Sequence, residues 1–202
     1  MDEKELSLTE IPSTDASPTD PQKKKKAAIA LISLAVVAVI AVICALLVRE
    51  YVVTTYIVDG ESMAPTLDGG VTGRTDDGDT LLLNMLGSPE RGDIVVFTYD
   101  WNGVTPHALV KRVIALPGDR VEISDGKLFL NGELLDEPYL KEDMDHFYDG
   151  FSVTVPDGHF FAMGDNRNNS TDSRAIGCVP QDKLIGVCFL IASDDGKLRI
   201  PK

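Results

Sequence analysis

The feature that most constrains this chain is an apolar segment, AAIALISLAVVAVIAVICALLV, which runs from Ala27 to Val48 without a charged residue. As a helix that rises about 1.5 Å per residue, the segment is long enough to cross the roughly 30 Å of hydrocarbon in a bilayer. All faces of this helix would be apolar, whereas a helix on the surface of a globular core keeps a polar face. The sequence therefore predicts a transmembrane helix over residues 27–48, with the lipid bilayer as a partner.

Basic residues are distributed unequally around this segment. Four lysines, Lys23 to Lys26, precede it, whereas Arg49 on the other side is followed at once by Glu50. Lysine and arginine near the end of a span are retained on the cytoplasmic side. We therefore expect a single-pass protein of the cytoplasmic membrane, with its N-terminus in the cytoplasm and everything after Arg49 outside.

A cleavable secretory signal is the alternative for a basic region followed by an apolar stretch. The apolar part of such a signal runs to only about 7–15 residues. Here the stretch is longer, and Ile43 and Ala45 make a poor small-x-small cleavage site. We therefore expect the helix to stay in place as an anchor.

Composition divides the rest of the chain into a tail and a domain. Residues 1–26 are rich in Ser, Thr, Pro, Asp and Glu and lack apolar periodicity, which predicts a disordered cytoplasmic tail. Residues 49–202 are numerous enough to bury a core and form the extracytoplasmic domain. The formal net charge of -13 argues against nucleic acid as a partner, because there is no net basic field to release counterions from it.

Short runs of β-type residues fill the domain and predict a mainly β, largely antiparallel fold. The dipeptides Asp125-Gly126, Asn131-Gly132 and Asp157-Gly158 favour the positive φ angles of tight hairpins. No strand alternates regularly with a long amphipathic helix, so a doubly wound α/β sheet is disfavoured. The run LLLNML, Leu81 to Leu86, is interpreted as a core strand, with a patch that dips into the membrane interface as the alternative. The expected strands are EYVVTTYIV, DTLLLNML, GDIVVFTY, HALVKRVIAL, RVEIS, KLFLNG, FSVTVP, HFFAMG and LIGVCFLIA.

The cysteines give no sign of a metal or cofactor site. The three cysteines, Cys44, Cys178 and Cys188, show no paired CxxC spacing, so neither a zinc site nor a disulfide-rich scaffold is indicated. Cys178 and Cys188 are interpreted as small buried thiols on neighbouring strands, with a disulfide as the alternative in an oxidising compartment. We expect neither a metal nor a cofactor.

Ser62, in the stretch GESMA, is a candidate nucleophile. The stretch is similar to the nucleophile elbow G-x-S-x-G with alanine in the last position, but the elbow needs a strand, turn and helix in a parallel sheet. A plain turn serine is the alternative. A serine hydroxyl becomes a useful nucleophile only when a neighbouring group takes its proton, so the chain must also supply a base.

Histidine is the usual base for serine, and the chain has three. His146 lies in the acidic stretch KEDMDHFYDG, which indicates a solvated side chain. His159 follows a predicted turn and is interpreted as flanking a strand. His107, which begins the run HALVKRVIAL, is the best histidine candidate.

Lys111 is the less usual candidate base. It shares one strand face with Leu109 and is bracketed by Val110 and Val113, which suggests apolar surroundings. Burial disfavours the charged ammonium and lowers its pKa, so that a neutral amine could act as a general base. The alternative is a surface lysine whose stem covers apolar surface while its head stays in water.

The stretch GDNRNNSTDSR, Gly164 to Arg174, has more hydrogen-bonding groups than a plain hairpin loop needs. This density predicts a network that orients something. The alternative is an exposed polar loop, in which an ion pair between Asp172 and Arg174 would contribute little to stability.

Taken in order, these stretches resemble one family, the bacterial type I signal peptidases, which are membrane-anchored proteases that remove signal peptides from exported proteins. The matching stretches are GESMAPTL, RGDIVVF, VKRVIALPGD and GDNRNNSTDSR. With the anchor and the segment KLFLNGELLDEPYL, the resemblance covers nearly everything from Ala27 onward. It implies an antiparallel β-sheet catalytic domain of signal-peptidase type, signal peptides of exported preproteins as substrates, cleavage after small residues in the pattern A-x-A, and proximity to the secretion translocon.

The resemblance also implies roles for individual residues. Ser62 would be the nucleophile and Lys111 its general base, working through an acyl-enzyme. Met63 would lie near the catalytic groups, and Ser170 would hydrogen-bond the lysine amine. The residues implied to hold the surrounding loop are Asp172, Arg174, Asp165 and Arg167.

The oxyanion hole is implied to use the backbone N–H of Ser62, with help from the segment at Gly60. Some family members have a serine hydroxyl at the position of Gly60, so the second donor stays open. Three residues depart from the common pattern. Asn168 stands in place of aspartate, Ala115 in place of glycine, and Glu61 adds a carboxylate that we expect to be exposed.

Two rival classes stay in view. A self-cleaving repressor-type serine–lysine protease shares the Ser-Met pair and a later lysine, but the membrane anchor argues against it. An anchored β-sandwich that only binds a partner would need Ser62 and Lys111 to be ordinary surface residues.

Overall fold

The structure, a computed structural model, describes residues 21–70, 77–101, 103 and 106–201. The chain divides into two compact units, Met1–Ala45 and Leu46–Lys202. Most of the predicted tail lies outside the described residues. Its described part, residues 21–26, is helical rather than disordered, because lysine is a good helix former and extends the apolar helix that follows.

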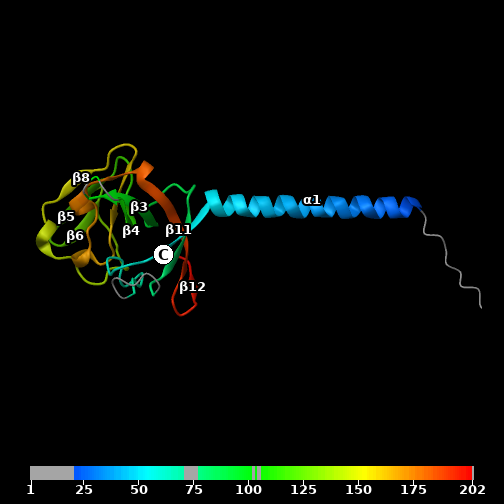
Figure 1. The fold of residues 1–202 in the computed structure, drawn as a ribbon. Coiled ribbons are helices and arrows are strands. Elements are labelled where there is room, and N and C mark those ends of the chain that lie inside the picture. The colour runs from blue at the N-terminus through cyan, green and yellow to red at the C-terminus, as the bar shows by residue number, and fades with distance from the viewer. Residues whose placement is uncertain (1–20, 71–76, 102, 104–105, 202) are drawn as a thin grey trace, which may run out of the picture. The chain divides into compact units, whose positions relative to one another are not determined.

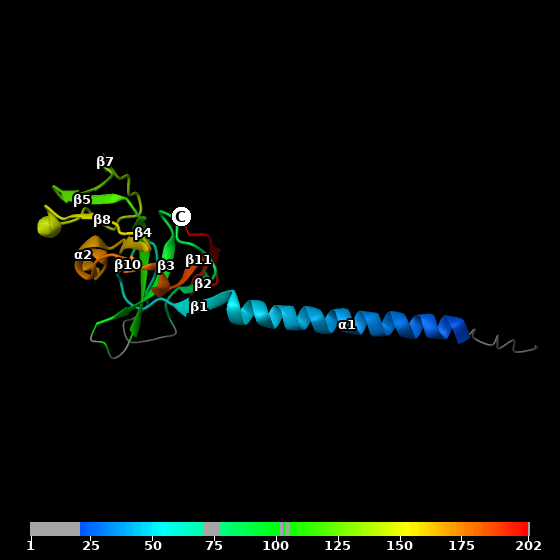
Figure 2. The same ribbon diagram turned by 90° about the horizontal axis from the view of Figure 1, so that it is seen from above.

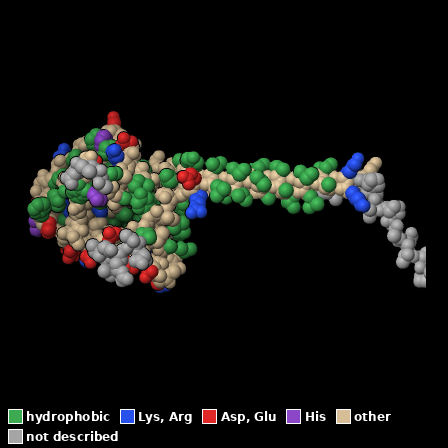
Figure 3. Space-filling model, viewed as in Figure 1, with side chains coloured by type: hydrophobic (Ala, Val, Ile, Leu, Met, Phe, Trp, Pro, Cys, Tyr) green, Lys and Arg blue, Asp and Glu red, His purple; other side chains and the backbone are tan. Residues whose placement is uncertain are grey.

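Helix α1 (Pro21–Tyr51) contains the predicted span and extends beyond it at both ends. An 18-residue window within its segment Lys24–Tyr51 has a mean hydropathy of 3.3, and by length and composition the helix is able to cross a membrane. Figure 3 shows hydrophobic side chains along the helix, with basic side chains at its two ends. α1 is therefore a candidate membrane span.

The domain is built from two antiparallel sheets, which confirms the predicted fold class. Every described strand pair is antiparallel. The large sheet has the order β1 (Val53–Ile57), β2 (Thr80–Asn84), β11 (Leu184–Ala192), β3 (Ile94–Asp100), β4 (Pro106–Ala115), β9 (His159–Met163) and β10 (Val179–Pro180), with β12 (Leu198–Arg199) paired to β11. The small sheet has the order β7 (Glu133–Leu134), β6 (Lys127–Leu130), β5 (Arg120–Ser124) and β8 (Ser152–Thr154). Figures 1 and 2 show the small sheet set apart from β1, β2 and β11.

Two of the three predicted turns form tight hairpins. Asp125 and Gly126 have φ angles of 54° and 65° between β5 and β6, and Asn131 and Gly132 have φ angles of 56° and 85° between β6 and β7. Two successive positive φ angles give the backbone twist that matches paired strands. The expectation for the third dipeptide is wrong, because Gly158 alone has a positive φ and joins β8 of the small sheet to β9 of the large one.

The run from Leu81 to Leu86 is chiefly a core strand, as the sequence indicated. Leu81 and Leu83 on β2 are fully buried and pack with Val58 and Met63, on either side of Gly60. Met85 and Leu86, just after β2, are exposed. The segment that carries Ser62 is thus anchored in the core by the residues around it.

The interpretation of the cysteines was partly wrong. Cys178 and Cys188 are free thiols, and Cys188 is buried whereas Cys178 is partly exposed. They do not lie on neighbouring strands, because Cys188 is on β11 and Cys178 precedes β10 at the far end of the sheet.

Candidate active site

Ser62 lies in a series of turns that follows β1, not at a strand–turn–helix elbow. The neighbouring Met63 and Leu67 are both 1% exposed, and the Leu67 N–H donates to the Met63 carbonyl at 3.0 Å. These contacts fix the turn against the hydrophobic core while Ser62 itself is only partly buried.

Lys111, in the middle of β4, meets Ser62. Its Nζ lies 2.7 Å from Ser62 Oγ and donates a hydrogen bond of 2.8 Å to the Val110 carbonyl. Lys111 is 3% exposed, which overturns the alternative of a surface lysine. Nucleophile and base candidates that lie far apart in the sequence are therefore in hydrogen-bonding contact.

The amine of Lys111 has a lowered pKa. Burial lowers the pKa from 10.5 to about 8, although the carboxylates of Asp172 and Asp165 oppose the shift. About one amine in ten is then uncharged at pH 7, and a larger share at higher pH. A buried amine of this kind is able to accept a proton from a hydroxyl.

The three histidines are engaged elsewhere or exposed. His146 Nδ1 lies 2.8 Å from an Asp149 carboxylate oxygen, and His159 Nδ1 lies 2.8 Å from the Asp157 carbonyl. His107, the best histidine candidate from the sequence, is exposed near the start of β4. Among the described side chains, the basic group that meets the Ser62 hydroxyl is the Lys111 amine.

The loop Gly164–Arg174 packs directly against the backbone of the segment that carries Ser62. The Asn166 N–H donates to the Ser62 carbonyl at 3.1 Å, and its side-chain amide donates to the Glu61 carbonyl at 3.0 Å. A Cβ on Gly164 would lie 2.4 Å from the Ser62 carbonyl oxygen and 2.3 Å from Ser170 Oγ. Only glycine at position 164 permits this close approach. The side chain of Glu61 is exposed, as expected.

The ion pair between Asp172 and Arg174 is buried, which rules out the exposed-loop alternative. Arg174 donates from Nε and Nη2 to the Asp172 carboxylate at 2.9 and 2.8 Å, and the Gly164 N–H donates to the same carboxylate at 3.0 Å. Burial alone would raise the pKa of Asp172, but hydrogen bonds from Arg174 and Gly164 lower it below its usual value. Removing one member of a buried pair is costly, because the other charge is left without compensation.

Ser170 does not make the hydrogen bond that the resemblance implied. Its Oγ is buried and makes no hydrogen bond to the lysine amine, although Ser170 lies close enough to Asp172 to help lower the pKa of that carboxyl. The Lys111 amine is instead directed toward Ser62 Oγ and the Val110 carbonyl. The functional role of Ser170 stays a prediction.

A second buried ion pair, which sequence reasoning missed, joins the segment of Ser62 to the strand of Lys111. Arg112 donates from Nε and Nη2 to the Asp165 carboxylate at 2.8 and 2.7 Å, and the Thr66 hydroxyl donates to the same carboxylate at 2.5 Å. Arg112 adjoins Lys111 and Thr66 follows Ser62 by one turn. Asp165 therefore ties the two reacting segments together.

Arg167 belongs to the same supporting structure through a residue that the sequence did not single out. Its Nη1 donates to Glu137 at 2.8 Å, and its Nε donates to the Gly164 carbonyl at 3.1 Å. The Tyr139 hydroxyl also donates to Glu137, at 2.9 Å. A signal was available in the sequence, because buried arginines require carboxylate partners and KLFLNGELLDEPYL supplies three, of which Glu137 is the one used.

The backbone N–H of Gly60 is already engaged in a hydrogen bond, so it is not a free second donor for an oxyanion. Gly60 has a φ of 86°, and its N–H donates to the Gly69 carbonyl at 3.3 Å. No described group accepts a hydrogen bond from the Ser62 N–H. That N–H remains the candidate oxyanion donor.

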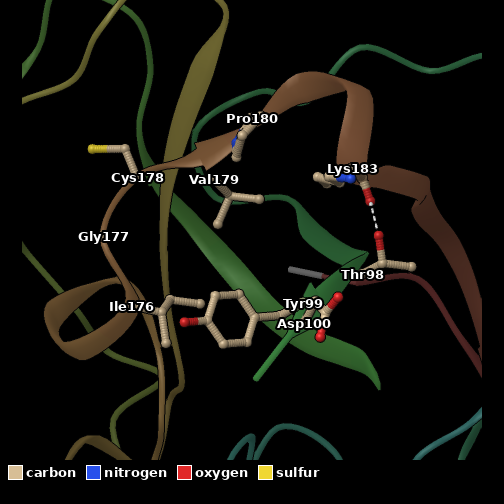
Figure 4. A pocket seen from close by; sticks show the side chains of 9 residues that line it. All are labelled: Thr98, Tyr99, Asp100, Ile176, Gly177, Cys178, Val179, Pro180 and Lys183. Atoms are coloured by element: carbon tan, nitrogen blue, oxygen red, sulfur yellow. Dashed lines mark hydrogen bonds between the residues drawn. The ribbon is translucent and has the colours of Figure 1, made fainter. Parts of the chain in front are cut away.

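A separate pocket of about 240 Å³ lies between the end of β3 and the segment after α2 (Ser173–Ile176). Figure 4 shows the Tyr99 ring and the side chains of Ile176 and Val179 lining it, and none of the predicted site residues is among the residues that form it. Across the described part of the chain, no cluster of three or more His, Cys, Asp and Glu side chains is arranged to hold a metal ion.

A serine hydroxyl beside a buried amine, carried by an antiparallel β domain, is the arrangement of a serine peptidase, a hydrolase. Comparison with known proteins narrows this class. The model of the signal peptidase family, peptidase S26, matches residues 31–192, and the chain belongs to that family.

Two sequence relatives agree with this assignment. Signal peptidase I S of Bacillus subtilis is 42% identical over 156 residues, which cover 70% of this chain and 78% of the relative. Signal peptidase I of Bacillus amyloliquefaciens is 38% identical over 171 residues, covering 78% and 85%. A crystal structure of a signal peptidase I from Enterococcus faecalis aligns with a TM-score of 0.43 and 34% identity, over 50% of this chain and 97% of that one.

Proposed function

We propose that this protein cleaves N-terminal signal peptides from exported proteins, after small residues in the pattern A-x-A. Ser62 is the nucleophile, neutral Lys111 is its general base, and the reaction passes through an acyl-enzyme. The observation that carries the proposal is the 2.7 Å contact between the Ser62 hydroxyl and the buried Lys111 amine.

Acylation begins with the neutral amine. One Nζ–H of Lys111 donates to the Val110 carbonyl, which leaves the lone pair available to the Ser62 hydroxyl. Lys111 takes the hydroxyl proton as Ser62 Oγ attacks the carbonyl carbon of the scissile bond, and the Ser62 N–H stabilises the oxyanion. The ammonium of Lys111 then protonates the leaving amine, the C–N bond breaks, and an ester to Ser62 remains.

Deacylation repeats the proton transfers with water. Lys111, neutral again, takes a proton from a water molecule whose oxygen attacks the ester carbonyl. The C–O bond to Ser62 breaks, the proton returns to Ser62 Oγ, and the carboxylate product leaves. Ser170 and the loop held by Asp172 and Arg174 border this site, and we assign them to its support.

Two strand edges support an extended peptide as the substrate. β4 pairs with β3 from Pro106 to Arg112, but β9 pairs with β4 only from Arg112 onward. Among the described strands, β1 pairs with β2 alone, so its outer edge is also open. A peptide added at such an edge gains backbone hydrogen bonds, and small pockets near Ile57, Val58 and Lys111 would then admit small side chains at the −1 and −3 positions.

We assign this reaction to a membrane surface because α1 is a candidate membrane span. We propose that α1 spans the cytoplasmic membrane once, that residues 1–26 lie in the cytoplasm, and that residues 49–202 form the catalytic domain outside. A substrate that emerges from the secretion translocon would meet the site there. The binding-module alternative requires a surface-exposed Lys111, and the burial of Lys111 argues against it.

The test replaces each member of the pair separately. Ser62→Ala and Lys111→Ala, purified in detergent as full-length chains, are assayed on a preprotein with an A-x-A site. We expect both to remain folded and to lose cleavage. Near-normal cleavage by either variant would exclude the proposed mechanism.

A further inference from the structure

The last described strand reaches back to the nucleophile segment through one side chain. Arg199 on β12 donates from Nη1 to the Thr66 carbonyl at 2.6 Å and from Nε to Ser193 Oγ at 3.1 Å. Its Nη2 forms an ion pair with Asp79. Figure 1 shows β12, in red, beside β11. Arg199 lies beyond residues 31–192, the part of the chain that the family model matches.

Asp79 hydrogen-bonds both ends of the segment that carries Ser62. The carboxylate of Asp79, 2% exposed, also accepts from the Asp68 N–H at 3.0 Å. Its backbone N–H donates to the Asp68 carbonyl at 2.8 Å, and its carbonyl accepts from the Val58 N–H at 2.9 Å. Asp79 thus joins the chain before Ser62 to the chain after it, and Arg199 adds a contact to both Asp79 and the turn.

Thr66 is held from two directions. Its hydroxyl donates to Asp165, which pairs with Arg112 on the strand of the base. Its carbonyl accepts from Arg199 on β12. The turn that follows Ser62 is therefore fixed between β4 and β12, and the planar guanidinium of Arg199 fits the two-point contact with Thr66 and Asp79.

We propose that Arg199 is a positioning residue for the cleavage reaction. It fixes the Thr66 turn and thereby the position of Ser62 Oγ relative to the Lys111 amine. It contacts neither of these reacting groups. The inference rests on the proposed serine–lysine mechanism, because it assigns Arg199 a role in the distance between those two side chains.

The expected effect is on rate more than on substrate binding or stability. A displacement of about 1 Å in a reacting group is able to lower a rate by about a hundred-fold. The Arg199 side chain is 41% exposed, so in its absence water is able to supply part of the hydrogen bonding that the Asp79 carboxylate loses. Its loss should therefore leave the domain folded while the turn shifts.

The experiment compares Arg199→Gln with Lys197→Gln in the full-length chain in detergent. Lys197 is a matched control, because it lies on the same hairpin, loses the same charge, and pairs only with the exposed Asp195 among the described residues. We expect Arg199→Gln to lower kcat about ten- to hundred-fold with KM little changed. We expect Lys197→Gln to behave as the wild type.

The pH profile separates positioning from general loosening. A shifted turn leaves Lys111 buried, so the midpoint of the profile should stay where the wild type has it while the plateau falls. A loosened site would admit water to Lys111 and move the midpoint upward. An upward shift, or a kcat equal to that of the wild type, would overturn the proposal.

Arg199→Lys decides the matter if Arg199→Gln does not fold. It keeps a charge beside Asp79, but a single ammonium lacks the fork that spans Asp79 and the Thr66 carbonyl. We expect it to fold and to have a lowered kcat, and a wild-type kcat would overturn the proposal. Failure of the proposed function itself looks different, because Ser62→Ala would then cleave as well as the wild type.

Discussion

In the proposed mechanism Lys111 is the base, and the fold keeps its amine away from water. Holding the charged form there costs the folded state about 3 kcal/mol, which corresponds to the lowering of the pKa from 10.5 to about 8. The unfolded chain binds this proton more tightly, so the cost is fully present below pH 8 and is relieved as the pH rises from 8 to 10.5. Burial of Lys111 thus lowers stability at neutral pH and makes the amine usable as a base.

The pH dependence of cleavage should follow the Lys111 amine. We expect kcat/KM to rise with pH through an apparent pKa of about 8, because only the neutral amine accepts the Ser62 proton. The measurement is cleavage of a short signal-peptide substrate from pH 6 to 10 at constant ionic strength. A midpoint near 10.5, typical of a solvated lysine, would contradict the assignment.

Gly164 should tolerate no side chain, because of its closeness to the Ser62 carbonyl. In Gly164→Ala the added methyl group must displace backbone, which should cost about 1–3 kcal/mol of unfolding free energy and lower kcat at least about ten-fold. Gly87→Ala is the matched control, because a Cβ there would lie 3.2 Å from the nearest atom, a Val187 side-chain carbon that is able to move. Urea unfolding and a cleavage assay measure the two effects. Equal results for both variants would contradict the prediction.

At the scale of elements, the pattern of the sequence reveals the long strands and misses the short ones. β4 and β11 have runs of apolar residues long enough to recognise, whereas β7, β10 and β12 have two residues each and carry no periodicity. The hairpins after β5 and β6 were predictable because Asp-Gly and Asn-Gly favour positive φ. The β8–β9 connection was not, because a turn dipeptide does not say which sheet the next strand joins.

The supporting loop was predictable as a network but not in its partners. The density of polar groups in residues 164–174 indicated a hydrogen-bonding network that orients other groups. That Asp165 pairs with Arg112, or Arg167 with Glu137, depends on contacts between residues far apart in the sequence. The contact between Ser62 and Lys111 was inferred from resemblance, since neither residue type alone reveals burial.

The segment that follows β7 should contribute to catalysis through the Glu137 side chain. Glu137→Gln leaves the Arg167 guanidinium buried without a charged partner, which should cost about 3–5 kcal/mol of unfolding free energy. Activity should fall as well, because Arg167 also holds the Gly164 carbonyl. Glu133→Gln on β7 is the control, as Glu133 is exposed. A Glu137→Gln variant as stable as this control in urea would show that the ion pair does not hold the loop.

At the scale of the whole molecule, the orientation of the anchor decides where the chemistry occurs. The positive charges of Lys23 to Lys26 predict that this end stays in the cytoplasm. Protease added to intact cells should therefore digest the region after Arg49, whereas an epitope placed before Lys23 should be protected until the membrane is opened. Immunoblots against both ends measure this. Protection of the domain and loss of the epitope would reverse the proposed topology.

The short connection between α1 and β1 has a consequence for substrate choice. A single residue, Val52, separates the end of α1 from the start of β1, and its carbonyl accepts a hydrogen bond from the Met85 N–H at 2.8 Å. This bond ties Val52 to the chain that follows β2. With α1 in the bilayer, a connection of one residue keeps the sheet within a short reach of the membrane, so we expect slow cleavage of preproteins whose scissile bond lies far from their own hydrophobic stretch.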